Sequence, residues 1–294
     1  MTPLRDLEQA SIHVLREAHA LFRRPACLWS TGKDSTVLLH LCRKAFLGRV
    51  PFPIVHLDTT YKFPDMYAFR DGLAREWGLD LLVAANREAI AAGTHPERGA
   101  FECCTALKTE ALRQCLAGHS FDAVFLAIRR DEHGIRAKER VFSPRGADFT
   151  WSYADQPLEM WDLFAARAPG EGHVRVHPML HWREVDVWRY IEAEKIPVVP
   201  LYFARLRPMV VRGETLIPVE NEVGLLPGEE PRMVMCRMRS LGCTPCTGAI
   251  RSEADTVPKI IEEMLGFRRS ERENRVIDHD QEGSMEIKKR EGYF

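Results

Sequence analysis

The sequence predicts an α/β protein with a doubly wound, mostly parallel sheet, helices on both faces of that sheet, and a loop-rich C-terminal region. Two observations predict this class. Short apolar runs alternate with segments of helical periodicity through the first half of the chain, and a short polar turn follows the first of those runs. Strands that alternate with helices are typical of parallel sheets, because each crossover needs a covering helix.

The elements follow in order. Residues 4–23 carry apolar side chains near a 3.6-residue period and predict an amphipathic helix. Strand-like apolar runs and helical segments then alternate. The runs span residues 26–29, 53–57, 79–83 and 123–128, and the helical segments span 64–77 and 105–117. Together they predict a nucleotide-binding catalytic domain over residues 1–205.

Residues 206–294 predict an irregular region. Its apolar pieces are short and separated by prolines, although residues 184–194 just before it still show a helical pattern. From residue 267 to the last residue charge dominates, which is typical of a solvated tail. We expect this region to dock a partner rather than to extend the sheet.

Composition excludes several classes of protein. With 45% apolar and 28% charged residues, the 294-residue chain is ordinary for a globular protein, and a net charge of −1 argues against nucleic acid as the main partner. No apolar run approaches the roughly 18 residues of a membrane helix, and no signal-peptide pattern is found. We expect a cytoplasmic protein whose eight cysteines are thiols, metal ligands or redox groups.

The polar turn predicts a phosphate site. It reads Ser30-Thr31-Gly32-Lys33-Asp34-Ser35 and leads into an apolar helical run. Such a turn directs backbone N–H groups and a helix N-terminus at an anion, Gly32 permits close approach, and Lys33 adds a positive charge. A Walker loop or a dinucleotide fingerprint needs a different glycine spacing, so both are excluded.

Polar residues also follow two other predicted strands. Ligands of open parallel sheets bind at the carboxyl ends of the strands, so these residues should converge with the phosphate turn. Asp58 is expected to contact the nucleoside or to cap a turn, and Asp34 to bind Mg²⁺ or to cap its helix. The segment 129–140 offers anion-binding cations for catalysis, together with Lys33: Arg129, Arg130, Arg136, Lys138 and Arg140.

Two cysteine pairs predict a metal or redox site. Cys103 and Cys104 are adjacent, and Cys243 and Cys246 form a C-x-x-C. Two such pairs are the usual composition of a four-thiolate zinc or iron–sulfur site. Core packing of Cys103 and Cys104, with a redox pair at Cys243 and Cys246, remains the alternative.

The turn resembles the S-G-G-K-D-S loop of the pyrophosphate-loop ATPases, with Thr31 in place of a glycine. Other motifs extend the resemblance over nearly the whole chain. These are Lys62-Phe63, Arg129-Arg130-Asp131-Glu132, the segments 136–140 and 200–202, and the C-terminal Gly292-Tyr293-Phe294. Together they are similar to the small catalytic subunits of the heterodimeric bacterial sulfate adenylyltransferases, in the phosphoadenylyl-sulfate reductase superfamily.

This resemblance implies an adenine nucleotide α-hydrolase-like fold and a nucleotidyltransferase of sulfate assimilation. Sulfate would attack the α-phosphorus of ATP, bound with Mg²⁺, to give adenylyl sulfate and pyrophosphate. Residues 30–35 would hold the pyrophosphate, Asp58 the nucleoside, and the 129–140 cations sulfate and phosphates. A separate GTPase large subunit would drive the reaction, with no nucleic-acid or membrane partner.

Three alternatives remain at this point. The cysteines resemble the cluster-binding pattern of adenylyl-sulfate reductases, but residues 247–294 contain no cysteine to serve as the nucleophile of a mobile tail. A sulfur-transfer enzyme acting on transfer RNA would share the loop and the paired cysteines, and the net charge opposes it. A non-catalytic nucleotide-binding subunit would not need the basic segment.

Overall fold

The computed structural model describes residues 3–154, 156–159, 172–213, 215–219 and 225–266. A six-stranded sheet forms the centre, in the order β3-β2-β1-β4-β6-β5. Its strands are β1 (Pro25–Leu28), β2 (Ile54–Leu57), β3 (Leu81–Ala84), β4 (Ala123–Phe125), β5 (Phe142–Arg145) and β6 (His173–Val176). All neighbours are parallel except β5 and β6. The predicted doubly wound, mostly parallel sheet is therefore confirmed.

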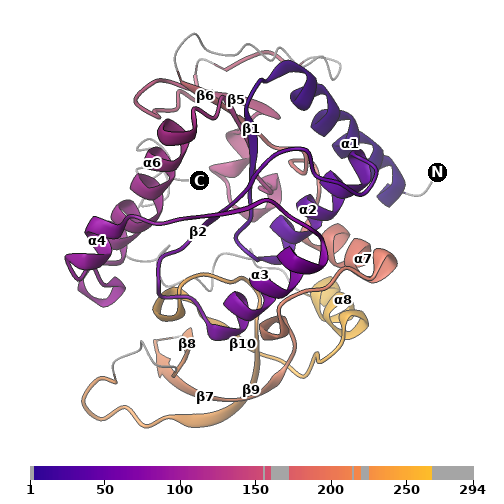
Figure 1. The fold of residues 1–294 in the computed structure, drawn as a ribbon. Helices are drawn as coiled ribbons and strands as arrows, with labels where there is room; N and C mark the ends of the chain where they lie inside the picture. The colour runs from indigo at the N-terminus through magenta and orange to yellow at the C-terminus, as the bar shows by residue number, and fades with distance from the viewer. Residues whose placement is uncertain (1–2, 155, 160–171, 214, 220–224, 267–294) are drawn as a thin grey trace.

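Helices cover both faces of this sheet. Figure 1 shows α1 and α2 on one side of β1 and α6 on the other. The helices of this part are α1 (Pro3–Leu21), α2 (Lys33–Ala45), α3 (Pro64–Glu76), α4 (Arg87–Ala91), α5 (Ala100–Cys104), α6 (Glu110–His119) and α7 (Glu184–Glu194). A π-helix, Thr105–Thr109, joins α5 to α6, so the helix predicted over 105–117 has a widened turn at its start.

Helix α1 packs through the stripe that its periodicity predicted. Its buried residues Ser11, Val14, Leu15 and Ala18 recur at intervals of three and four, as one helix face requires. The buried Ser11 hydroxyl accepts a hydrogen bond from Trp182 Nε1 at 2.9 Å and donates one to the Pro178 carbonyl at 2.8 Å. The one polar side chain among these four buried residues is therefore hydrogen-bonded.

The second part of the structure follows α7. Four antiparallel strands form a small closed barrel in the order β10-β8-β7-β9. They are β7 (Arg205–Arg212), β8 (Thr215–Pro218), β9 (Arg232–Met238) and β10 (Ala249–Arg251), and α8 (Val257–Gly266) follows them. These strands lie in the region expected to be irregular, because Pro208 and Pro218 interrupt the alternation from which strands are predicted. The domain division at residue 206 and the charged tail 267–294, which lies outside the described residues, stay predictions.

No helix among the described residues combines the length and the apolar character needed to cross a membrane.

A buried histidine in β2 makes the stability of this fold depend on pH. Burial, aided by the charge of Lys62, lowers the pKa of His56 to about 3, and its Nδ1 donates to the Trp29 carbonyl at 2.9 Å. In the unfolded chain the same imidazole binds a proton near pH 6.5, so stability is complete above that pH and falls as the pH drops toward 3. From pH 7.5 to 5.0, His56 is expected to remove about 2 kcal/mol from the free energy of unfolding.

Urea unfolding of the wild type and of His56→Asn at both pH values measures this effect. Asparagine keeps a donor near the position of Nδ1 but does not titrate. The pH-dependent loss should be about 2 kcal/mol smaller in the variant. Equal losses in the two proteins would mean that His56 is protonated in the folded state.

Candidate active site

A tight turn between β1 and α2 forms the predicted phosphate loop. Gly32 caps α2, which begins at Lys33, and the Gly32 carbonyl accepts hydrogen bonds from Ser35 Oγ at 3.0 Å and Thr36 Oγ1 at 2.9 Å. Ser30 Oγ and Ser35 Oγ are 3.1 Å apart and share a further hydrogen bond. These hydroxyl contacts fix the loop before any ligand binds. The N-terminus of α2 therefore adjoins a preformed loop.

Thr31 holds an unusual conformation within this loop. Its φ is 63°, in the left-handed region that favours glycine, and its side chain is buried. A glycine at this position would meet the requirement without strain, as in the S-G-G-K-D-S loop. Thr31 does not line the pocket described next, and its hydroxyl donates to the Ser30 carbonyl at 2.6 Å.

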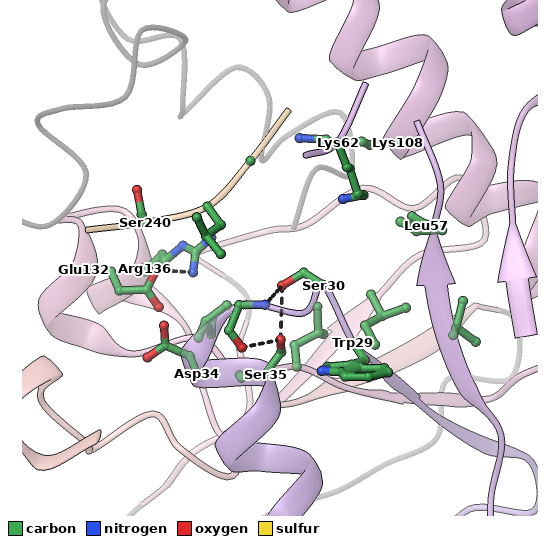
Figure 2. Close-up of a pocket in the computed structure, with 18 of the residues that line it drawn as sticks. Trp29, Ser30, Asp34, Ser35, Leu57, Lys62, Lys108, Glu132, Arg136 and Ser240 are labelled. Carbon is green, nitrogen blue, oxygen red and sulfur yellow. Dashed lines mark hydrogen bonds and ion pairs between the residues drawn. The ribbon is translucent and has the colours of Figure 1, made fainter. Parts of the chain in front are cut away.

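One pocket lies against the loop. The ends of three neighbouring strands, β2, β1 and β4, supply an apolar part that includes Trp29, Val55, Leu57 and Leu126. The polar part contains Ser30, Gly32, Asp34, Ser35, Lys62, Lys108, Glu132, Arg136, Tyr202 and Ser240. Figure 2 shows Ser30 and Ser35 at the loop and Lys62 and Lys108 on the wall opposite Asp34. The ends of three strands meet at this pocket, as predicted. The apolar part of the pocket lies next to its charged part.

The Lys33 ammonium lies behind the loop and away from the pocket lining. Its side chain is fully buried, 3.3 Å from Asp34 Oδ2 and 3.7 Å from Glu184 Oε1, and it donates to the Arg239 carbonyl at 3.4 Å. Glu184 also binds the Arg239 guanidinium at 2.7 Å. Lys33 therefore links α2 to α7 and to the segment after β9, and its direct contact with a phosphate stays a prediction.

Tyr202 occupies a position that the sequence left unassigned. Its hydroxyl accepts a hydrogen bond from the Lys33 backbone N–H at 2.8 Å, and its ring packs edge-on against Trp188. Tyr202 is buried and lines the pocket. The first N–H of α2 thus meets a hydroxyl oxygen where a phosphate loop would offer it to an anion.

Among the five predicted cations, Arg136 alone lines the pocket. Its Nη1 lies 2.6 Å from Glu132 Oε2, which holds the guanidinium in place. Arg130 contacts His181 at 2.9 Å and Glu159 at 3.6 Å, Lys138 is exposed over the Tyr153 ring, and Arg140 is half-buried. The segment 129–140 therefore brings one of its cations to the pocket in this structure.

Arg129 is fully buried and holds the pocket wall together. It pairs with Asp34 from the loop, with Asp131 at 3.0 Å, and through its backbone N–H with Glu132 Oε1 at 2.9 Å. Asp131 Oδ2 in turn accepts the backbone N–H of Glu184, the first residue of α7, at 2.8 Å. Arg129 joins the end of β4 to α2 and, through Asp131, to α7.

Asp58, predicted to contact the nucleoside, lies beside the pocket instead of in its lining. Its Oδ1 accepts hydrogen bonds from the Thr60 backbone N–H and from the Tyr67 hydroxyl, each at 2.8 Å. Arg70 lies 4.0 Å from the other carboxylate oxygen. In this structure Asp58 caps the turn after β2, which is the alternative that the sequence left open.

Two lysines complete the set of cations in the pocket. Lys62 follows β2, and Lys108 lies in the π-helix Thr105–Thr109. The sequence predicted Lys62 at the lip of the nucleotide site, whereas it did not assign Lys108 there. A π-helical turn is frequent at functional sites and is not visible in a sequence. Their position opposite the phosphate loop gives the pocket positive charge on two walls (Figure 2).

The four cysteines come together close to the pocket. Burial, with Cys104 and Cys243 nearby, raises the pKa of the Cys103 thiol to about 12, and burial with Cys243 and Cys104 does the same for Cys246. Cys243 Sγ also contacts Thr59 Oγ1 at 3.2 Å. Metal ligation needs thiolates, and within the described ranges no three His, Cys, Asp or Glu side chains are arranged to hold a metal ion. As placed, the four thiols do not fit a metal site, and the zinc or iron–sulfur site stays a prediction.

Gly32 is expected to be required for ligand approach and dispensable for the fold. Its φ of −68° suits any residue, and an added Cβ would lie 3.3 Å from Ser30 Oγ and 3.5 Å from Tyr202 Oη, inside the pocket mouth. Gly32→Ala should change the free energy of unfolding by no more than about 1 kcal/mol and weaken ATP binding roughly tenfold. Calorimetric titration with ATP and urea unfolding measure the two effects.

Gly72→Ala is the matched control, since a Cβ at Gly72 in α3 meets no atom within 4 Å. That variant should bind ATP as the wild type does. Unchanged ATP affinity in Gly32→Ala would place the phosphates elsewhere.

Comparison with known proteins shows the family of this chain. The phosphoadenosine phosphosulfate reductase domain matches residues 24–249. Over 99% of its length the chain is 52% identical to a protein of Myxococcus xanthus named sulfate adenylyltransferase subunit 2, 96% of which is covered. A protein of the same name from Methylococcus capsulatus is 51% identical, covering 100% of this chain and 98% of that protein. Among solved structures, a phosphoadenylyl-sulfate reductase from Candida auris in a phosphate complex matches at 17% identity and a TM-score of 0.48, over 68% of this chain and 91% of that one. From the identity to its full-length relatives, the chain belongs to the sulfate adenylyltransferase subunit 2 family, within the phosphoadenosine phosphosulfate reductase domain family.

Proposed function

We propose that this chain is a nucleotidyltransferase that moves the adenylyl group of ATP to sulfate, forming adenylyl sulfate and releasing pyrophosphate. One observation carries the proposal: a single pocket joins the phosphate loop, an apolar slot, and the cations Arg136, Lys62 and Lys108. Two anionic substrates that must approach each other need such a charge distribution. The names of the full-length relatives support the same reaction.

The pocket divides into parts that match the parts of ATP. The slot formed by Trp29, Val55, Leu57 and Leu126 suits the adenine ring, which is flat and apolar on its faces. The Ser30 and Ser35 hydroxyls and the N-terminus of α2 suit the β- and γ-phosphates, which leave as pyrophosphate. The α-phosphorus would then lie between the loop and the opposite wall. Asp58, which caps the turn beside this slot, remains our proposal for the nucleoside contact.

Sulfate would enter on the side of Arg136, Lys62 and Lys108. Its oxygen attacks the α-phosphorus, a new P–O bond forms, and the bond to the pyrophosphate oxygen breaks. Sulfate is a weak nucleophile that needs no deprotonation at neutral pH, so no general base is required. Catalysis then depends on in-line placement and on cations that offset the charge of two anions in a partly buried site.

Mg²⁺ would accompany the ATP phosphates. Asp34 and Glu132 are the two carboxylates among the lining residues, and Mg²⁺ commonly uses one or two carboxylates beside phosphate oxygens. When bound, the ion neutralises phosphate charge. Asp34 is held by Arg129, and Glu132 by Arg136, so both carboxylates are already positioned.

The mixed anhydride lies uphill of ATP and sulfate, so synthesis needs a second source of free energy. We propose that the other subunit implied by the name subunit 2 is a GTPase whose hydrolysis reaction drives the transfer. The cytoplasm, where ATP and GTP are supplied, is the proposed location. Lys33 lies 3.7 Å from Glu184, the first residue of α7, so a movement of α7 caused by that subunit would also move the phosphate loop.

Pyrophosphate release from ATP and Mg²⁺ tests the proposal. Anaerobically purified protein is assayed with and without sulfate, and with the co-expressed other subunit and GTP in a parallel reaction. Release that depends on sulfate and rises with GTP is expected. Absence of release in every reaction would overturn the proposed function.

The four clustered cysteines favour a second candidate, an adenylyl-sulfate reductase-like or sulfur-transfer activity. A four-cysteine zinc or iron–sulfur site would support it. Metal analysis of anaerobically purified wild type and Cys243→Ser tests this candidate directly. About one zinc, or several irons with sulfide, per chain and their loss in the variant would favour it, whereas metal-free wild type would exclude it. No step of the adenylyl transfer is routed through these thiols.

A further inference from the structure

Three hydroxyl groups surround one point in the pocket, beside Gly32. A Cβ added to Gly32 marks this point, which lies 3.3 Å from Ser30 Oγ, 3.5 Å from Tyr202 Oη and 4.0 Å from Ser35 Oγ. Figure 2 shows the two serine hydroxyls facing each other at the phosphate loop, whereas Tyr202 comes from the turn Pro200–Tyr202. An oxygen atom of a ligand near this point would be within reach of hydroxyls from two parts of the fold.

Packing fixes the Tyr202 hydroxyl beside this point. Tyr202 is 1% exposed, and its ring packs edge-on against Trp188 of α7, with 5.4 Å between the ring centroids. The Lys33 backbone N–H donates a hydrogen bond to the tyrosine oxygen at 2.8 Å. A side chain that is packed in this way is preorganised. A phosphate that approaches the first turn of α2 therefore meets the tyrosine hydroxyl in place of the Lys33 N–H.

The hydrogens of the two serine hydroxyls are directed into the loop. Ser35 Oγ donates to the Gly32 carbonyl at 3.0 Å, so the hydrogen shared between Ser30 and Ser35 comes from Ser30. Each hydroxyl carries one hydrogen, so both serines must turn before they can donate to a ligand. In the bond from Lys33, by contrast, Tyr202 supplies a lone pair, and its own hydrogen points away from that N–H. The tyrosine can therefore donate to a ligand and keep its contact with Lys33.

Lys33 makes this hydroxyl a stronger hydrogen-bond donor. Its backbone N–H withdraws electron density from the tyrosine oxygen, and its ammonium lies 5.8 Å from the centre of the Tyr202 ring. Hydrogen bonds to an anion are roughly twice as strong as bonds between neutral groups. Lys33 does not line the pocket, so Tyr202 is the group through which its charge supports an anion there.

We propose that the Tyr202 hydroxyl belongs to the pyrophosphate site, where it accepts the Lys33 N–H and donates its own hydrogen to an oxygen of the β- or γ-phosphate of ATP. This inference rests on the proposed function, in which the loop holds the part of ATP that leaves as pyrophosphate. It adds to that site a residue from outside the phosphate loop.

Binding of pyrophosphate with Mg²⁺ to the full chain, measured by calorimetry, tests this proposal. Tyr202→Phe removes the hydroxyl and keeps the ring against Trp188. We expect it to weaken the binding of pyrophosphate and of ATP roughly tenfold or more, because a hydrogen bond to a charged group is lost. AMP lacks the β- and γ-phosphates, so its affinity should stay within twofold of wild type.

Tyr190→Phe is the matched control. Tyr190 is also a buried tyrosine whose hydroxyl binds a partner, Glu8 of α1, but it does not line the pocket. Its loss should leave pyrophosphate affinity within twofold of wild type. Circular dichroism and urea unfolding first establish that both variants are folded.

A double variant tests where the hydroxyl acts. Gly32→Ala places a methyl group at the point that the three hydroxyls surround. If a phosphate oxygen lies near this point, the methyl group already displaces it. Adding Tyr202→Phe to Gly32→Ala should then change pyrophosphate affinity by less than twofold, because the two substitutions remove the same contact.

Three outcomes would overturn the proposal. Tyr202→Phe could bind pyrophosphate as tightly as wild type or more tightly, because the tyrosine only occupies an N–H that phosphate itself needs. The variant could lose affinity for AMP and pyrophosphate equally, because the hydroxyl only orders the loop. The loss could also be the same with Gly32 and with Gly32→Ala, which would place the contact elsewhere. Since binding is measured without turnover, each outcome is distinct from failure of the adenylyltransferase assay.

Discussion

Arg129→Met is expected to lower the free energy of unfolding by about 3 kcal/mol. The guanidinium is fully buried and is the shared partner of Asp34 and Asp131. Methionine removes this cation from Asp34 and Asp131, and breaking a buried pair costs several kcal/mol. Asp34 keeps Lys33 at 3.3 Å. Asp34 and Asp131 keep 18% and 36% exposure, so solvent offsets part of the loss and places the value at the low end. Urea unfolding at pH 7.5 measures it.

Arg130→Met is the control, because the neighbouring arginine is one-third exposed and lies 3.6 Å from Glu159. Exposed ion pairs contribute little, so we expect a loss of no more than about 1 kcal/mol. Equal losses in the two variants would show that the network around Arg129 does not stabilise the fold. The two arginines are adjacent in sequence and identical in type, so the comparison isolates burial.

Strands β1 to β4 were predictable because they lie in short, mostly apolar runs, whereas β5 and β6 were not predicted, because Arg145, His173 and Arg175 interrupt their apolar pattern. Residues 54–57 are buried without exception, as expected for a strand covered on both faces. The helix predicted over 184–194 is observed with the same bounds, since its apolar period and its start are local signals. Such elements are visible in a sequence because neighbours along the chain carry the pattern.

The small barrel was not predictable in the same way. β7 contains a proline, and its outward positions carry Leu206 and Pro208 where a polar residue would mark a solvent face. Exposed apolar residues remove the alternation from which a strand is inferred.

The candidate site also has one part that was predictable from the sequence and another that was not. The phosphate loop is local, and Ser30 and Ser35 lie where the motif places them. Which arginine of 129–140 faces the pocket depends on the turns Arg130–Glu132 and Arg136–Lys138 and on partners such as Glu132. The number of charged residues in this segment does not determine which side chain faces the pocket. Lys108 is a stronger example, because only the widened π-helical turn and the packing of α5 and α6 bring it to the pocket.

Arg136→Ala is expected to lower the kcat/KM of sulfate-dependent pyrophosphate release by a factor of about 100 or more. Arg136 lines the pocket and is held by Glu132 at 2.6 Å, so its charge is fixed before the substrates bind. A preorganised donor in a partly dry site stabilises charge that a flexible surface cation would not. Arg136→Lys should recover part of the rate, because it restores the charge without the planar fork.

Lys138→Ala is the matched control within the same turn. Lys138 is exposed over the Tyr153 ring and does not line the pocket, so kcat/KM should stay within about twofold of wild type. Removing Arg136 takes away one partner of Glu132, so circular dichroism and ATP titration must first establish that the variant is folded and binds nucleotide. A folded Arg136→Ala variant with full activity, or a Lys138→Ala variant with the larger loss, would mean that the segment 129–140 rearranges when substrates bind. The pair of substitutions thus tests whether the basic segment acts through its total charge or through the one guanidinium that the fold directs into the pocket.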